Sequence, residues 1–352
     1  MAEDATAARG RRPPVIPGGM QTLIVGIGAL GGVIGARLSA AGVPVSLAVR
    51  DRATADGLQA SGLAVTGVGG SAQAAVADVA PLADFPAGRS FDLIVLATKA
   101  HEAMEIAPAL ARRLTPGGTL LPIQNGAVSR VLADRLGEDR VLGGLSNLGA
   151  TMHSPGNYEQ RNAGHLLVGE LAGGDSTRAR KVRDWLGQGL EVRLTPNLQG
   201  AIWSKLLLNC SVTTIGAVAG RTMREYVSSP EGRALFDRTY EETLSVARAS
   251  GARPERMLVD PVPPARPSAA YDAWLGEVIA GYGDVKPSML QDFDRGRRTE
   301  VEFINGYVAA LGPRHGVPTP VNAAIVEVVE AITRRELAPD PRLLARIVRA
   351  GG

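Results

Sequence analysis

Short apolar runs alternate with longer helical patterns through the N-terminal part of the chain. Residues 22–25 form an apolar run that ends in glycines, and a helical pattern over 30–41 leads to a second run at 45–49. Further strands are expected at 63–66, 91–97, 118–123 and 141–144, with helices at 102–114 and 128–136. Strands that alternate with helices predict a doubly wound, mainly parallel α/β sheet with right-handed crossovers.

The pattern changes after residue 149. Strands are expected at 165–169 and 191–194 around a polar helix at 176–186. From about residue 199 every signal is helical, at 202–218, 231–250, 288–294, 300–311 and 321–337. Proline-rich stretches at 254–267 and 313–320 predict a surface loop and a turn. We therefore expect an α/β domain over 20–197 and an all-helical domain over 198–352, after a disordered extension at 1–19.

Composition supports two ordinary globular domains and excludes several classes of protein. A chain of 352 residues exceeds the usual size of one core. The net charge is only +3, from 38 basic and 35 acidic residues, and aromatic residues make up 4%. The basic run at 295–298 is short, so no nucleic-acid partner is expected. No apolar run of about 18 residues predicts a membrane span.

Cysteine and histidine content argues against disulfides and metal sites. Cys210 is the single cysteine, so no internal disulfide forms, and a reducing cytoplasmic location is expected. The N-terminal residues lack the apolar stretch of a secretory signal. The histidines show no metal-ligand spacing and are expected to be surface or structural residues: His101, His153, His165 and His315. Cys210 itself is expected to be a small buried hydrophobic residue.

A glycine-rich loop between the first predicted strand and helix is the main functional motif. It runs Gly26-Ile27-Gly28-Ala29-Leu30-Gly31 and fits G-x-G-x-x-G. In this context Gly26 suits a tight turn, Gly28 a close approach of pyrophosphate, and Gly31 close packing of helix on sheet. The helix N-terminus then favours phosphate. The pattern predicts a Rossmann-type dinucleotide-binding domain, and the alternative is a glycine-rich turn without a ligand.

Arg50 at the end of the second predicted strand bears on the choice of cofactor. NAD-binding domains usually carry an acidic residue here, whereas an arginine suits the 2′-phosphate of NADPH. Arg52 lies two positions further on. Asp51 between them leaves NADH as the alternative, because its carboxylate would reach the ribose if the strand ended one residue later.

Several short motifs, in order along the chain, resemble the ketopantoate reductase (2-dehydropantoate 2-reductase) family. They are Gly26-Ile27-Gly28-Ala29-Leu30-Gly31, Thr98-Lys99-Ala100, Gln124-Asn125-Gly126, Lys205-Leu206-Leu207-Leu208-Asn209, Ser288-Met289-Leu290-Gln291-Asp292, Gly296-Arg297-Arg298-Thr299-Glu300 and Ile304-Asn305-Gly306. The resemblance implies a Rossmann domain joined to a helical domain. It also implies hydride transfer from NADPH to a 2-keto acid in the cleft between them.

The same resemblance implies roles for individual residues. Lys205 matches the family's catalytic lysine, and Glu300 matches a glutamate that supports the lysine and the substrate. The positions that match substrate or cofactor contacts are Asn209, Ser288, Lys99 and Asn125. One position departs from the family pattern: Thr213 stands where a second substrate-binding asparagine is common. That difference leaves the identity of the keto acid open.

Chemistry gives an independent reason to single out the lysine. Reduction of a ketone requires a proton donor for the nascent alkoxide, and a partly buried lysine supplies one. Lys205, Asn209 and Thr213 are four residues apart and share one face of the predicted helix at 202–218. Glu300, at the start of the predicted helix at 300–311, is a plausible partner favoured there by the helix dipole.

Each of these residues also has a purely structural interpretation. Lys205 fits an ordinary lysine at a helix rim, and Glu300 fits a first-turn residue. Asn125 lies in a sequence typical of a plain turn, and Ser288 suits a helix cap.

The sequence therefore predicts NADPH-dependent reduction of a 2-keto acid, with ketopantoate as the first substrate. The alternatives are another keto acid, an opine-type imine, or a non-catalytic NADP-binding protein. The stereochemistry of the product stays open. The apolar helix at 321–337 leaves room for a homodimer.

Overall fold

The computed structural model describes residues 19–351, which divide into two compact units. The first unit holds residues up to Gln124 and residues 128–198. The second holds residues 125–127 and the chain from Gln199 onward. The expected extension at 1–19 lies, apart from Gly19, outside the described residues.

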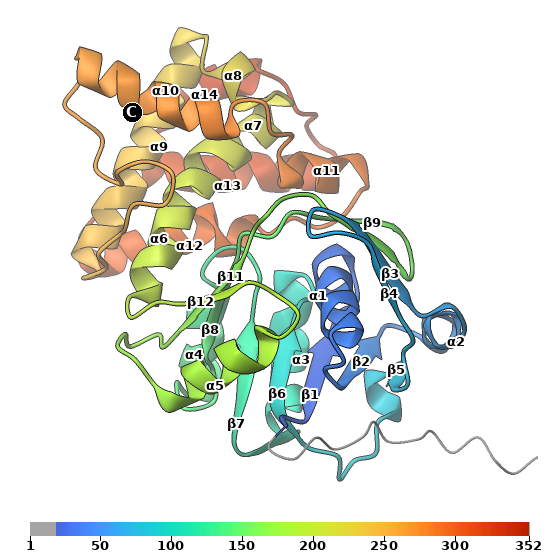
Figure 1. Ribbon diagram of the computed structural model, residues 1–352. Helices are drawn as coiled ribbons and strands as arrows, with labels where there is room; N and C mark the ends of the chain where they lie inside the picture. The colour runs from blue at the N-terminus through green and yellow to red at the C-terminus, as the bar shows by residue number, and fades with distance from the viewer. Residues whose placement is uncertain (1–18, 352) are drawn as a thin grey trace, which may run out of the picture. The chain divides into compact units, whose positions relative to one another are not determined.

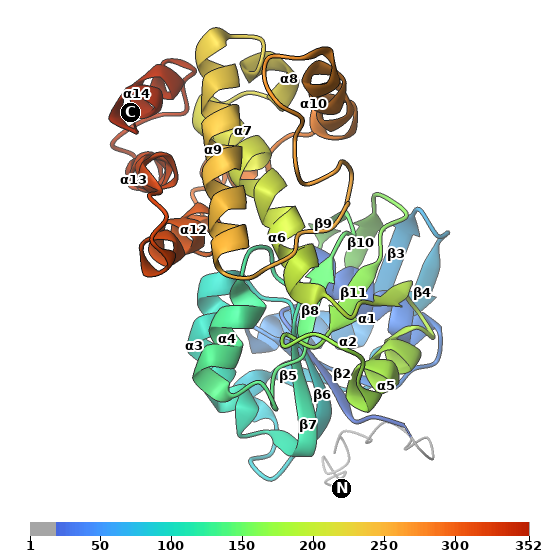
Figure 2. The ribbon, with the colours of Figure 1, turned by 90° about the vertical axis from the view of Figure 1, so that its left-hand side faces the viewer.

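A five-stranded sheet forms the centre of the first unit. Its order is β5-β2-β1-β6-β7, and all neighbouring strands are parallel. The strands are β1 (Thr22–Val25), β2 (Val45–Val49), β5 (Val79–Pro81), β6 (Phe91–Leu96) and β7 (Leu114–Pro122). Helix α1 (Ala29–Ala40) lies on one face, and α3 (Ala100–Ala111) and α4 (Val128–Leu136) lie on the other (Figures 1 and 2). The predicted doubly wound parallel sheet is confirmed.

The order of the strands fixes where a ligand would bind in this unit. Strand β1 pairs with β2 on one side and with β6 on the other, so the chain changes direction across the sheet at β1. Ligands of open α/β sheets collect at the carboxyl ends of the strands beside such a switch point. The glycine loop follows β1 at this position.

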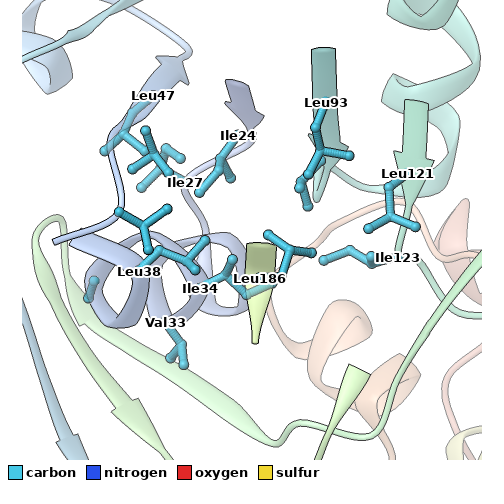
Figure 3. Close-up of a cluster of buried hydrophobic side chains, with 14 of the residues drawn as sticks. Ile24, Ile27, Val33, Ile34, Leu38, Leu47, Leu93, Leu121, Ile123 and Leu186 are labelled. Atoms are coloured by element: carbon cyan, nitrogen blue, oxygen red, sulfur yellow. The ribbon is translucent and has the colours of Figure 1, made fainter. Parts of the chain in front are cut away.

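Apolar side chains attach α1 firmly to the sheet. Figure 3 shows Ile34 and Leu38 of α1 gathered with Ile24, Leu47 and Leu93 of the strands. All five are fully buried, and each such side chain contributes about 1.5–3 kcal/mol by burial. The packing fixes the N-terminus of α1 against the carboxyl end of β1.

Two smaller sheets complete the first unit. One has the order β4-β3-β10-β9 and packs on α1, and the other has the order β12-β11-β8. Their strands are β3 (Leu63–Gly67), β4 (Ala72–Ala74), β8 (Gly143–Ser146), β9 (Ala150–Ser154), β10 (Asn157–Gln160), β11 (Leu166–Gly169) and β12 (Val192–Leu194). Helix α5 (Thr177–Leu186) packs on β11 and β12. The segments expected at 63–66 and 141–144 therefore belong mainly to these sheets.

The sequence pattern missed α2 (Arg52–Ser61), β4, β5, β9 and β10. In α2 only Ala55 and Leu58 are buried, so the helix has little apolar periodicity to detect. The missed strands have only three to five residues each and are largely polar or half-buried, which weakens the alternation that identifies a strand.

The second unit is built from helices, as the sequence predicted. They are α6 (Leu198–Leu208), η2 (Asn209–Thr213), α7 (Thr214–Ala219), α8 (Met223–Tyr226), α9 (Pro230–Ala249), α10 (Ala269–Tyr282), α11 (Ser288–Asp294), η3 (Val301–Phe303), α12 (Asn305–Leu311), η4 (Gly312–His315), α13 (Pro320–Thr333) and α14 (Arg342–Ala350). Helices α8, α10 and α14 were not predicted from the sequence pattern.

Two helical predictions need correction. The helix expected at 300–311 is broken: η3 is a 3₁₀ turn, and α12 begins only at Asn305, because Ile304 has non-helical backbone angles (φ −111°, ψ −100°). The apolar face expected to leave room for a dimer is already buried. Val321, Ile325 and Val329 of α13 are fully buried, and α13 packs against α9, α12 and α14. That face thus belongs to the core of its own unit.

Within residues 19–351, one helical segment, Leu198–Ala219, is long and apolar enough to cross a membrane. However, 83% of its apolar window is buried inside the protein. Its composition is accounted for by its place in the core of the second unit.

Candidate functional site

The glycine loop has the geometry that a dinucleotide-binding turn requires. Gly26 has a φ of +91°, which favours glycine. A Cβ on Gly31 would lie 2.0 Å from the carbonyl oxygen of Gly26, so this position tolerates no side chain. A Cβ on Gly28 would meet nothing within 4 Å. The loop thus packs tightly at Gly26 and Gly31 and leaves open space at Gly28, where the pattern places the pyrophosphate.

The N-terminus of α1 has features that favour binding of an anion. Gly28 is the N-cap and offers no side-chain hydrogen bond, while Ala29 and Leu30 open the first turn. No acidic residue occupies that turn. The first N–H groups of a helix carry partial positive charge and bind phosphate readily.

Tyr158 of β10 contacts the glycine loop and the first turn of α1. Its ring packs on Gly32, where a Cβ would lie 2.0 Å from Cε1 of the tyrosine. Its hydroxyl donates to the carbonyl oxygen of Ile27 at 3.3 Å. Burial raises the pKa of Tyr158, so the hydroxyl stays protonated and remains a donor. No local pattern predicts this contact, because the two residues are 131 positions apart.

Polar groups at the carboxyl ends of β6 and β7 lie beside the loop. A Cβ on Gly26 would come within 2.7 Å of the backbone nitrogen of Thr98. Gln124 donates from Nε2 to the carbonyl oxygens of Leu96 and Thr98, at 2.9 and 3.0 Å. Lys99, predicted to contact cofactor, lies between Thr98 and the start of α3.

Three buried polar atoms in this region have no hydrogen-bond partner among the described residues. They are Thr98 Oγ1, His101 Nδ1 and Gln124 Oε1. A buried polar group without a partner costs about 1–3 kcal/mol, so these atoms fit a site that binds a polar ligand. His101 thus departs from the expected satisfied structural histidine. The open position at Gly28 and these three atoms fit a dinucleotide.

The residues after β2 take different roles. The side chain of Arg50 is 85% exposed and forms a loose ion pair with Glu102, with NH2 at 3.7 Å from Oε1. Arg52 pairs with Asp84 at 2.5 Å. Asp51 caps α2 by accepting from the Thr54 N–H at 2.8 Å, and this hydrogen bond lowers the pKa of Asp51. Of the two arginines, Arg50 is held more loosely.

Lys205, Asn209 and Thr213 are the least buried side chains of an otherwise buried helical segment in the second unit. Between residues 201 and 219 only Lys205 and Thr213 are half-buried, and Asn209 at 9% is the next most exposed side chain for which a value is given. The π turn η2 between α6 and α7 contributes to this alignment. An α-helix turns by about 100° per residue, and a π turn by less. Thr213 therefore points from the helix axis in nearly the same direction as Lys205, closer than it would in a regular α-helix.

Glu300 acts electrostatically on Lys205. Burial lowers the pKa of Lys205 to about 8, and the Glu300 carboxylate opposes this shift by stabilising the ammonium. Part of the lysine side chain meets solvent, but protein atoms surround its charged end. Glu300 lies just before η3 rather than in the first turn of a long helix, so the helix dipole expected there does not apply.

The turn that contains Asn125 joins the second unit. Gly126 has a φ of +78°, and a Cβ there would lie 2.2 Å from the carbonyl oxygen of Phe303. That same oxygen accepts the Ala127 N–H at 3.0 Å. Asn125 is therefore anchored to the segment that follows Glu300.

Two other candidates lie differently. Ser288 is exposed at the start of α11, which packs against α7. Its predicted alternative role as a cap is wrong, because the N-cap is Pro287 and no side chain caps this helix.

Cys210 is fully buried, and burial raises the pKa of its thiol, as expected for a small hydrophobic residue. No group of three or more metal-ligand side chains occurs in the part of the chain that the structure describes.

Comparison with known proteins gives a consistent family. The family model "Ketopantoate reductase PanE/ApbA" matches residues 22–173, and "Ketopantoate reductase PanE/ApbA C terminal" matches residues 197–333. A 2-dehydropantoate 2-reductase of Halobacterium salinarum is 28% identical over 317 residues, which cover 90% of this chain and 99% of that protein.

Solved structures share the fold. A PanE/ApbA family ketopantoate reductase of Ralstonia eutropha JMP134 has a TM-score of 0.76 at 24% identity, covering 90% of this chain and 99% of the other. A D-mandelate dehydrogenase, solved with NADH and anilino(oxo)acetate, has a TM-score of 0.76 at 21% identity with the same coverage. At these identities the two structures bear on the fold alone.

Proposed function

Because the chain belongs to the ketopantoate reductase family of oxidoreductases, we propose that it reduces a 2-keto acid to the 2-hydroxy acid with NADPH. Ketopantoate, which would yield pantoate for pantothenate biosynthesis, is the proposed first substrate, and a cytoplasmic location is proposed with it. The observation that carries the proposal is Lys205, whose pKa burial lowers to about 8 beside Glu300, on the helix face shared with Asn209.

The residues of the second unit would supply the proton. NADPH, when bound, would supply the hydride for the keto carbon, which leaves the carbonyl oxygen in need of a proton. The Lys205 ammonium gives that oxygen its proton and then regains one from water, with Glu300 stabilising the charged form. Asn209 and Asn125 would hold the substrate with amide hydrogen bonds, and Ser288 would add a hydroxyl contact.

The direct test is NADPH oxidation against a panel of 2-keto acids that includes ketopantoate. We expect turnover with at least one of them, and the best substrate is the one with the highest kcat/KM. Tight NADPH binding with no turnover across the panel would instead support a non-catalytic NADP-binding protein.

NADPH is proposed over NADH because of Arg50. We expect Arg50→Ala to weaken NADPH binding by about 10- to 100-fold, since a hydrogen bond to a charged group contributes about 1.5–3 kcal/mol. Binding of NADH, which lacks the 2′-phosphate, should change little. Arg52→Ala is the matched control, because Arg52 is already paired with Asp84. A wild-type preference for NADH, measured by kcat/KM with both cofactors, would contradict this proposal.

The rate of reduction should depend on pH through Lys205. Only the protonated amine donates a proton, so kcat is expected to fall as pH rises through about 8. The Glu300 carboxylate raises the pKa of Lys205, and Glu300→Gln should therefore move the midpoint to lower pH. A kcat profile measured from neutral to alkaline pH on both proteins tests this. A profile that Glu300→Gln leaves unmoved would remove Glu300 from its proposed role.

Thr213 favours a second candidate, a related reductase acting on another 2-keto acid or an imine. Its hydroxyl donates to the carbonyl oxygen of Asn209 at 3.0 Å. Toward a substrate this hydroxyl therefore acts as an acceptor, whereas an asparagine at the same position would also donate. The D-mandelate dehydrogenase of the same fold acts on a different hydroxy acid. Adding an amine donor to the keto acid panel separates the cases, because an imine reductase would require the amine.

A further inference from the structure

A buried asparagine joins the two segments that carry the proposed catalytic groups. Asn305, the first residue of α12, is fully buried. Its Nδ2 donates to the carbonyl oxygen of Cys210 at 3.4 Å and to Oδ1 of Asn322 at 2.9 Å. Cys210 lies in η2 next to Asn209, and Asn305 lies five residues after Glu300. Asn305 therefore connects the Asn209 turn with the Glu300 segment.

The carboxylate of Glu242 determines how the side-chain amides of Asn322 and Asn305 are oriented. Glu242 accepts from the backbone N–H groups of Val321 and Asn322, both at 2.9 Å, and from Nδ2 of Asn322 at 2.8 Å. Both oxygens of Glu242 accept backbone N–H groups, so Nδ2 of Asn322 faces this acceptor and Oδ1 of Asn322 faces Asn305. Asn305 then has to present its own Nδ2. The direction of the chain of hydrogen bonds follows from Glu242.

The π turn depends on such contacts because its backbone departs from the α-helical pattern. The N–H of Thr214 reaches back five residues to the carbonyl oxygen of Asn209. The next two carbonyl oxygens receive side-chain donors: Cys210 from Asn305, and Ser211 from the hydroxyl of Tyr226 at 2.7 Å. Both donors come from outside the turn and are buried. They hold the widened turn in place from two directions.

We propose that Asn305 is a positioning residue, which fixes the Glu300 segment against the π turn and so holds the Glu300 carboxylate in its place relative to Lys205. The proposal rests on the proposed function of Lys205 and Glu300. Asn305 touches no reacting atom in this account, and its effect passes through Glu300 and Asn209. Displacement of a catalytic group by about 1 Å lowers turnover by on the order of 10²-fold.

The test replaces Asn305 and follows Lys205 in two ways. Asn305→Ala is expected to lower kcat for keto acid reduction by about 10- to 100-fold, with the KM for NADPH nearly unchanged. The pH midpoint of kcat should also move down, because Glu300 no longer supports the ammonium. The second readout needs no turnover: the rate at which an acylating reagent modifies Lys205, located by peptide mapping, should show the same downward shift with pH.

Two further variants keep the proposal falsifiable. Tyr226→Phe removes only the hydroxyl that donates to Ser211, and it should shift both readouts in the same direction by a smaller amount, even if Asn305→Ala does not fold. Leu275→Ala in α10 is the matched control for lost stability, because it creates a cavity without removing a hydrogen bond of this network.

The outcomes separate the two proposals. If the Asn305 and Tyr226 variants lose stability like Leu275→Ala but keep the pH midpoint and the acylation profile of Lys205, the positioning role is overturned. If the wild-type protein turns over no keto acid while the acylation profile shifts as expected, the proposed function fails and the positioning role stands.

Discussion

Replacement of Lys205 by alanine is expected to lower kcat for keto acid reduction by on the order of 10²- to 10⁴-fold. The physical reason is the loss of the group that gives the carbonyl oxygen its proton as negative charge develops there. Burial brings the pKa of this lysine to about 8, so at neutral pH the amine is mostly protonated and still a strong enough acid to donate. The Kd for NADPH should stay near the wild-type value, because the glycine loop proposed to bind its phosphates belongs to the first unit.

Single-turnover kinetics and NADPH fluorescence titration measure the two quantities separately. Lys205→Arg is an informative companion, because arginine keeps the positive charge but does not release its proton near neutral pH. It should be nearly as slow as the alanine variant. Lys181→Ala, at an exposed lysine of α5, controls for the general effect of removing a charge. Wild-type kcat in Lys205→Ala would refute the assignment of Lys205 as the acid.

Gly31→Ala is expected to produce the second large effect, a loss of cofactor binding by about 10- to 100-fold. The new Cβ would lie 2.0 Å from the carbonyl oxygen of Gly26, which is a backbone atom that cannot move aside without opening the loop. Overpacking of this kind costs about 1–3 kcal/mol, and each 1.4 kcal/mol corresponds to about tenfold in Kd. Isothermal titration with NADPH measures the loss, and thermal unfolding reports how much of it reflects the fold.

Two other glycines give matched controls for Gly31→Ala. Gly28→Ala places its Cβ in open space, so it should leave the melting temperature unchanged while it blocks the approach of the pyrophosphate. The new Cβ of Gly57→Ala in α2 also meets nothing within 4 Å. This substitution should lower neither the melting temperature nor the affinity for NADPH. If Gly28→Ala bound NADPH like the wild-type protein, the loop would be a structural turn without a phosphate ligand.

The sequence located most of the candidate groups because their signals are local. The order of strand, glycine loop and helix is written in consecutive residues, and so is the spacing of Lys205, Asn209 and Thr213. The three groups are the least buried side chains of an otherwise buried helical segment. Glu300 was found as a candidate by resemblance, but its local structure was predicted wrongly, because a helical pattern does not reveal the break at Ile304.

Contacts between distant segments were beyond the reach of any sequence pattern. Tyr158 packs on the phosphate loop from a short strand that was not predicted, and the Asn125 turn is held by Phe303. The buried unpaired atoms of Thr98, His101 and Gln124 are likewise visible only when burial is known. None of these residues has a periodicity or a neighbour in sequence that would signal its role.

By itself, the sequence determined the doubly wound sheet, the helical second unit, the place of the glycine loop after the first strand and the helical spacing of Lys205, Asn209 and Thr213, because each depends on hydrophobic period or spacing within one segment. Only the tertiary structure decided how deeply the Lys205 ammonium is buried, which side chains hold the π turn, and where the apolar face of α13 is buried. Those outcomes depend on pairing across long separations, where burial and hydrogen bonding are set by the whole fold.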